Sequence, residues 1–142
     1  MIGFFFFLGI IFFMFEIYVL TNSKLYLRVL RGMYENREKK NRGEEVEKLP
    51  SQWSLFTEDQ KTSMRIAFFS FFYFLWLVTG ALVSSNWYIF AGIILFGYLV
   101  SFYRKRMLKY NTRGSLNLIK FDAIVSALSI AFLILNHFHN LL

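Results

Sequence analysis

Long apolar runs alternate along the chain with short charged stretches. Residues 2–20 are apolar or aromatic except for Glu16, residues 66–103 contain no charged side chain, and residues 123–142 contain no Asp, Glu, Lys or Arg. As one helix, residues 66–103 would measure about 57 Å, nearly twice the roughly 30 Å of a bilayer's hydrocarbon core. The polar cluster near the middle of that run is Ser84–Asn86, and serine and asparagine favour turns. The pattern therefore predicts four membrane-spanning helices.

These crossings indicate an all-α polytopic membrane protein that forms a single four-helix domain over residues 1–142. Thr57 and Gln60 match a capping box, so a helix is expected to start there and to run into the second crossing. The first run is interpreted as a spanning helix and not as a cleavable signal peptide, because no basic residue precedes it and no small-x-small site follows it. The predicted spanning helices cover about residues 2–20, 66–83, 87–103 and 121–141, with loops at about 21–65 and 104–120.

Composition supports a bilayer environment. Of the 142 residues, 56% are hydrophobic and 21% aromatic, which is more apolar surface than a water-soluble domain of this size could bury. The net charge is +7, but the basic residues stand between apolar runs, so nucleic acid is not an expected partner. The lack of cysteine excludes disulfides, thiolate catalysis and cysteine metal ligands.

The basic residues also predict an orientation. All 16 Lys and Arg lie in residues 24–65 and 104–120. Because cytoplasmic loops are enriched in Lys and Arg, both loops are expected on the cytoplasmic side and both termini on the opposite side. The membrane is expected to be the inner or plasma membrane of a bacterium, or an equivalent organellar membrane.

The same basic residues are candidates for contact with anionic lipid head groups. After the first crossing, Lys24, Arg28 and Arg31 recur at helical spacing, which predicts an extension of the first helix along the membrane surface. Residues 35–48 carry mixed charges without an apolar period and predict a solvated loop. The alternative for the basic residues is that they only mark topology. The full set of lipid-contact candidates is Lys24, Arg28, Arg31, Arg104, Lys105, Arg106 and Lys109.

Polar and small residues recur on one side of the fourth predicted helix. Because polar groups in hydrocarbon need partners and small residues let helices approach closely, this side is expected to be buried against protein. A polar lining for an ion or solute path is the alternative. The polar stripe comprises Asp122, Ser126, Ser129, Asn136 and Asn140, and the small-residue packing candidates are Ala123, Ala127 and Ala131 beside it, with Gly9, Gly80 and Gly97 in the other helices.

Glu16 is the one carboxylate in the first apolar run, four residues before the predicted cytoplasmic end at Leu20. One interpretation is that its side chain reaches toward the interface and is hydrated there. The other is that Gly9 lets a neighbouring helix approach and bring a cationic or hydroxyl partner, with Arg104, Lys120 or a residue of another protein as candidates.

The sequence contains no recognisable catalytic constellation, so an enzyme is not expected and no cofactor or metal is predicted. His137 and His139 are two residues apart and project differently from a helix, so they cannot chelate one metal ion. The expected function is helix–helix contact, as an accessory, assembly or scaffold subunit of a larger membrane complex or of a homo-oligomer. A pore-forming, membrane-permeabilising effector of the holin or defence type is the alternative, followed by a small transporter or membrane enzyme. The expected partners are membrane lipids, including anionic head groups, and other membrane subunits or copies of the same chain.

Overall fold

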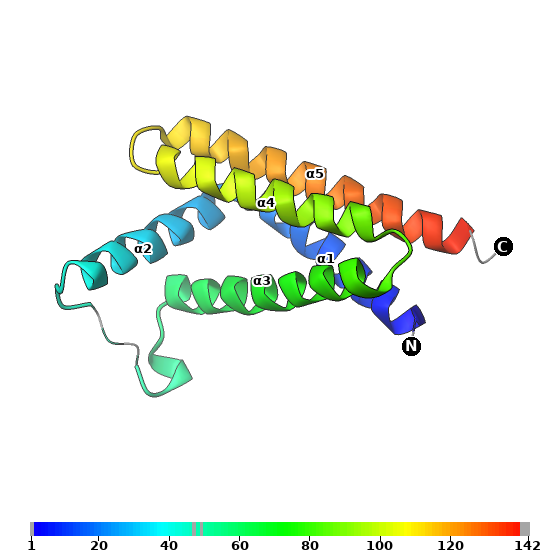
Figure 1. Ribbon diagram of the computed structural model, residues 1–142. Helices are drawn as coiled ribbons and strands as arrows, with labels where there is room; N and C mark the ends of the chain where they lie inside the picture. Colours follow the sequence, from blue (N-terminus) through cyan, green and yellow to red (C-terminus); the bar gives the residue numbers. More distant parts are fainter. Residues whose placement is uncertain (1, 47, 49, 140–142) are drawn as a thin grey trace.

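A computed structural model shows an all-helical chain (Figure 1). The structure describes residues 2–46, 48 and 50–139, so Asn140 of the predicted polar stripe lies outside the described residues. The elements are α1 (Ile2–Thr21), α2 (Ser23–Asn41), a short 3-10 helix η1 (Trp53–Leu55), α3 (Glu58–Val83), α4 (Trp87–Met107) and α5 (Thr112–His139).

Four of the helices are long and apolar enough to cross a membrane. These spans are Gly3–Thr21, Glu58–Val83, Trp87–Met107 and Thr112–His139. The prediction of an all-helical chain with four potential spans is therefore confirmed, and the chain is suited to an integral membrane position.

The segments predicted as loops contain more helix than expected. α2 continues to Asn41, through the first half of the segment predicted to be a solvated loop. Its Glu, Arg and Lys residues are good helix formers, and the helix ends just before Gly43, whose positive φ of 72° suits glycine. α5 begins at Thr112, nine residues before the predicted start at 121. Asn111 explains the early start, because its Oδ1 accepts a hydrogen bond from the Gly114 backbone N–H at 2.8 Å.

The capping box at the start of α3 is confirmed. The Thr57 hydroxyl accepts a hydrogen bond from the Gln60 backbone N–H at 3.2 Å, and the Gln60 side chain accepts one from the Thr57 N–H at 3.0 Å. α3 therefore starts at Glu58, eight residues before the predicted span at 66. At the end of α1 the chain turns at Asn22, so α2 leaves the line of α1 as a separate helix (Figure 1).

The apolar core lies at the end of the bundle that holds the turn between α3 and α4. Its buried side chains are Phe12, Trp76, Leu77, Phe90, Ile93, Ile130 and Leu133. α1 reaches this core at Gly9, where an added Cβ would lie 3.1 Å from Cζ2 of Trp76. The Trp76 indole N–H also donates a hydrogen bond to the Phe5 carbonyl at 2.9 Å, which ties α3 to α1.

α3 and α4 pack closely beside their connecting turn and separate toward their other ends. Near the turn, the Phe90 ring occupies the space that a side chain at Gly80 would need. Farther from the turn the two helices diverge (Figure 1). A second, smaller core joins α1, α2 and α5 at the opposite end of the bundle, which holds the Lys- and Arg-rich residues 104–109 and is called the basic end. This core comprises Val19, Leu27, Leu108, Ile119 and Ala123. The divergence of α3 from α4 leaves space between these two cores.

Candidate functional site: an acidic cavity between the spanning helices

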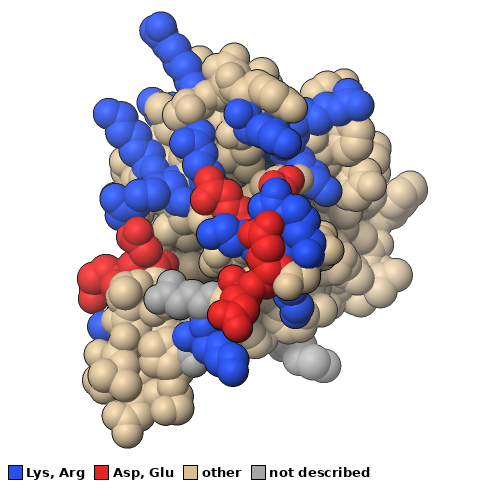
Figure 2. Space-filling model, turned by 90° about the vertical axis from the view of Figure 1, so that its left-hand side faces the viewer, with Lys and Arg blue, Asp and Glu red and all other residues tan. Residues whose placement is uncertain are grey.

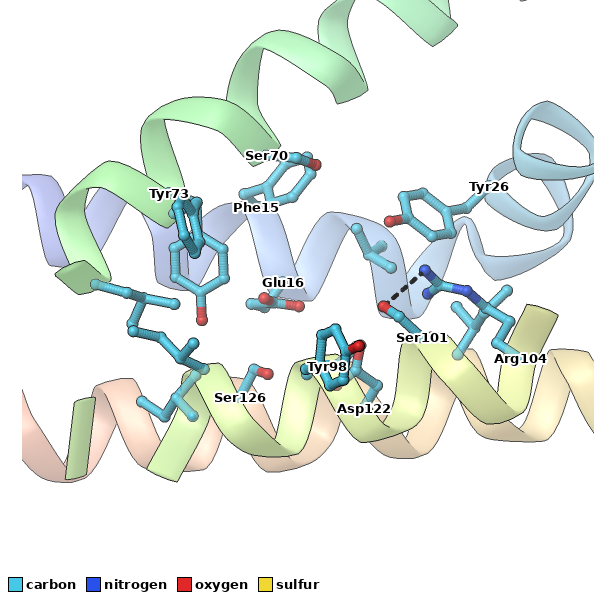
Figure 3. A pocket seen from close by; sticks show the side chains of 18 residues that line it. Phe15, Glu16, Tyr26, Ser70, Tyr73, Tyr98, Ser101, Arg104, Asp122 and Ser126 are labelled. Carbon is cyan, nitrogen blue, oxygen red and sulfur yellow. Dashed lines mark hydrogen bonds between the residues drawn. The ribbon is translucent and has the colours of Figure 1, made fainter. Parts of the chain in front are cut away.

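A cavity of about 380 Å³ lies where α3 and α4 separate. α1 and α5 also contribute side chains to it, and Tyr26 reaches it from α2 (Figure 3). Nine of its lining residues carry polar groups: Glu16, Tyr26, Ser70, Tyr73, Tyr98, Ser101, Arg104, Asp122 and Ser126. A polar cavity among helices suited to a membrane is a candidate functional site, because polar groups in hydrocarbon are costly unless they have partners.

Glu16 lies at the centre of this cavity. Glu16 is only 8% exposed, and its carboxyl group points into the cavity from α1 (Figure 3). Tyr73 on α3 also points its hydroxyl group into the cavity, beside Glu16 and on the side of Ser126 (Figure 3). The two side chains come from helices that meet at Gly9 and Trp76, so the aromatic packing of the core positions them.

The polar groups of the cavity are incompletely paired. Oδ1 of Asp122 and the hydroxyl oxygen of Tyr73 are buried and have no hydrogen-bond partner within the described part of the chain. The salt bridges found among residues 2–46, 48 and 50–139 join Arg28 to Asp59, Arg42 to Glu44 and Lys61 to Glu58, and none includes a cavity carboxylate. The site thus presents hydrogen-bonding and charged groups that the described chain leaves without partners.

Arg104 is the cation that lines the cavity. Its Nη2 donates a long hydrogen bond of 3.4 Å to the Ser101 hydroxyl group on the same helix (Figure 3). If both carboxyl groups are ionised, Glu16, Asp122 and Arg104 together carry one net negative charge. Tyr26, outside the spans, adds a neutral group, because burial raises the pKa of its phenol.

The mouth of the cavity lies on the outer surface of the helices. Tyr98 on α4 is 71% exposed and Phe74 on α3 is 52% exposed, and both line the cavity. Its floor is formed by the buried Glu16 and Ser126. In a bilayer, the cavity would therefore open sideways, toward lipid or toward a neighbouring helix.

The structure brings together only part of the predicted polar stripe. Asp122 and Ser126 line the cavity, whereas Ser129 lines a neighbouring groove between α4 and α5 and donates a hydrogen bond to the Val125 carbonyl at 2.8 Å. Asn136 is half-buried and lies toward the other end of α5. Among the small residues beside the stripe, Ala123 and Ala127 are buried and Ala131 is half-buried.

The three glycines proposed for packing differ in their surroundings. Gly9 and Gly80 lie against the rings of Trp76 and Phe90. Gly97 has no atom within 4 Å of the position that a Cβ would take, and it lines the cavity. Close helix approach is therefore found at Gly9 and Gly80 but not at Gly97.

Several basic residues proposed for lipid contact have partners in the protein. Arg28 forms a 2.7 Å salt bridge with Asp59, and Arg31 donates to the Thr112 hydroxyl group at 2.9 Å. The remaining candidates outside the cavity are exposed: Lys24, Lys105, Arg106 and Lys109. Figure 2 shows Lys and Arg gathered over the basic end of the molecule, with Asp and Glu among them. Lipid contact stays a prediction for these four residues.

Sequence reasoning did not identify the tyrosines of the cavity. Tyr73 lies in the aromatic run of residues 71–76, whose composition is typical of a lipid-facing segment. The available signal was that Tyr73 is the one tyrosine of α3, and a phenol in hydrocarbon needs a hydrogen-bond partner. Tyr26 carried no such signal, because its segment was expected on the membrane surface.

The described residues contain no group of three or more His, Cys, Asp or Glu that could hold a metal ion. The His137 ring instead stacks on Phe6, with ring centroids 3.6 Å apart.

Comparison with protein-family models, curated proteins and solved structures gives no match to this chain.

Proposed function

We propose that this chain is a small integral membrane protein that works by helix–helix contact, as an accessory, assembly or scaffold subunit of a larger membrane complex or of a homo-oligomer. The observation that supports this function is the sideways-opening cavity whose lining includes Glu16 and Asp122. Unpaired polar groups at such a site favour association with a helix that supplies their partners.

The physical chemistry of helix association in lipid supports the same function. Lipid tails are as apolar as leucine, so burial of apolar surface alone gives little driving force between spanning helices. Packing and interhelical hydrogen bonds supply it instead. The cavity offers both, because Phe74 and Tyr98 flank a floor that contains carboxyl and hydroxyl groups. A volume of about 380 Å³ suits one or two inserted side chains.

A pore-forming effector is the second candidate function. The observation that favours it is the groove of about 300 Å³ between α4 and α5, which shares Ile93 and Ser126 with the cavity and extends to Ser129. Polar groups thus continue along α5 beyond the cavity. In an oligomer with this groove turned inward, Ser126 and Ser129 would face an opening.

The proposed orientation has the basic end in the cytoplasm and both termini on the other side. The gathering of Lys and Arg at one end supports this orientation (Figure 2). Leu142→Cys and Arg42→Cys variants test it, because the chain has no other cysteine. An impermeant thiol reagent applied to intact cells should label position 142 and leave position 42 unlabelled. Labelling of both positions from outside would contradict four crossings.

Position-specific cross-linking in native membranes tests the proposed function. We compare Tyr98→Cys at the cavity mouth with Phe72→Cys on the opposite side of α3, which is 45% exposed. Phe72 lies eleven residues before the end of α3 at Val83, and Tyr98 lies eleven residues after the start of α4 at Trp87. The two cysteines would therefore have similar depths in the membrane. A photo-reactive cross-linker attached to the introduced thiol couples to any neighbouring side chain, so it should convert the Tyr98→Cys chain into a defined larger species and leave the Phe72→Cys chain monomeric. If neither variant cross-links and the full chain is monomeric in mild detergent, the contact function is wrong.

A further inference from the structure

Lys120 is the basic residue of α5 nearest to the cavity acids in depth. It lies two residues before Asp122, which corresponds to about 3 Å along the helix axis. Lys120 is exposed, whereas Asp122 lines the cavity. A separation of two residues turns a side chain by about 200°, so the two residues lie on nearly opposite faces of α5. Lys120 therefore points away from the cavity of its own chain.

The exposed face of α5 continues beyond Lys120 as an apolar ridge. Ile124, Leu128 and Phe132 follow at intervals of four residues, and they are 42%, 66% and 57% exposed. Side chains four residues apart form the ridges that pack into grooves between neighbouring helices. The ridge thus combines one positive charge with a row of apolar side chains that extends toward the turn end of the bundle.

The cavity has the complementary features. Glu16 is more than nine-tenths buried and aimed into the cavity, and no salt bridge among the described residues includes it (Figure 3). Glu16 and Asp122 thus place two carboxyl groups in a cavity lined by one cation, Arg104, and Oδ1 of Asp122 has no hydrogen-bond partner in the described part of the chain. The mouth between Phe74 and Tyr98 is flanked by apolar and aromatic surface. One ammonium group from outside the chain would supply hydrogen-bond donors and a positive charge to these carboxyl groups.

We propose that Lys120 of a second copy enters the cavity and pairs with Glu16 and Asp122, while the ridge of that copy lies along the groove between α3 and α4. This inference rests on the proposed contact function and specifies its partner. Donor and acceptor surfaces lie on different faces of each chain, so the contact is head-to-tail. Because all copies share one orientation in the membrane, repetition of the contact turns about the membrane normal, and it gives a ring where that rotation closes.

Mixing two variants tests this arrangement. Lys120→Gln chains keep an intact cavity, and Glu16→Gln chains keep an intact lysine. Each variant alone should associate in liposomes roughly tenfold more weakly than the unsubstituted chain, as judged from energy transfer between labelled copies. Mixed in equal amounts, the two variants should form heterodimers with close to the normal affinity, because one complete lysine–carboxylate contact remains. Recovery in the mixture also shows that both variants are folded.

Cross-linking defines which faces meet. Tyr98→Cys on one chain should form a disulfide with Leu128→Cys on another, and Tyr98→Cys should not couple to Phe72→Cys. If the unsubstituted chain associates but Lys120→Gln does so equally well, the lysine pairing is wrong and the contact function stands. If Tyr98→Cys couples only to a different protein, the second-copy partner is wrong. A chain that stays monomeric and makes no cross-link contradicts both proposals.

Discussion

The two ends of the helical bundle are built differently. At the turn end, Trp76 and Phe90 fill the spaces left by Gly9 and Gly80, and the interior is apolar. At the basic end, Gly97 faces open space, and the interior contains carboxyl, hydroxyl and guanidinium groups around a cavity. Tight packing needs glycine beneath large rings, whereas a binding site needs unfilled volume and unpaired groups. The comparison indicates that the turn end holds the helices together, and the proposed contact with a partner lies at the basic end.

Equal substitutions at the two kinds of glycine should therefore have unequal effects. Gly80→Ala places a Cβ within the space of the Phe90 ring and should destabilise the chain by about 2–3 kcal/mol, as overpacking does in filled cores. Gly97→Ala adds a methyl group to open space and should be neutral, or stabilising by up to about 1 kcal/mol through helix propensity. Unfolding of the detergent-solubilised chains by increasing SDS measures both. Equal destabilisation by the two variants would show that the ends do not differ in packing.

The four spans and several polar residues of the cavity could be predicted from the sequence, but the convergence of these residues and the open space at Gly97 could not. The 38 uncharged residues from 66 to 103 require a turn, so the four spans follow from bilayer thickness alone. Glu16, Asp122 and Ser126 were each singled out as polar groups in hydrocarbon. Their meeting depends on the packing of α1 along α5, which are far apart in sequence, and no local pattern specifies that pairing. The extra turns of α5 depend on Asn111, a single capping residue in a segment dominated by charge.

The tie between α3 and α1 provides a smaller test at the turn end. Trp76→Phe keeps an aromatic ring but removes the N–H that donates to the Phe5 carbonyl, so it should cost about 1 kcal/mol of stability. Trp87→Phe is the matched control, because Trp87 is 59% exposed at the start of α4. It should leave the SDS midpoint unchanged. A larger effect at Trp87 than at Trp76 would contradict the assignment of the turn end as the stable core.

The smallest effect is expected at the edge of the basic end. Arg31 connects α2 to the start of α5 through the Thr112 hydroxyl group and to the Leu108 carbonyl. Arg31→Gln should cost about 0.5 kcal/mol, because the Thr112 contact is exposed and solvent screens such contacts. Arg31→Gln should also make amide hydrogen exchange along α2 faster, and this change should be easier to detect than the change in stability. Lys24→Gln, an exposed change on the same helix, should leave the exchange unchanged, and equal acceleration by both variants would contradict a specific role of Arg31.

The central claim is that the acidic cavity serves association and not the fold of the single chain. The most direct test is the size of the complex that contains the tagged full chain, solubilised in mild detergent from native membranes, with and without Glu16→Leu. Leucine removes the buried carboxyl group at a position suited to hydrocarbon, so the variant should be expressed and inserted at least as well as the unsubstituted chain. The account predicts that the unsubstituted chain migrates in a complex larger than the monomer and that Glu16→Leu migrates as a monomer. A Glu16→Leu chain that inserts normally and remains in a complex of unchanged size would contradict the account.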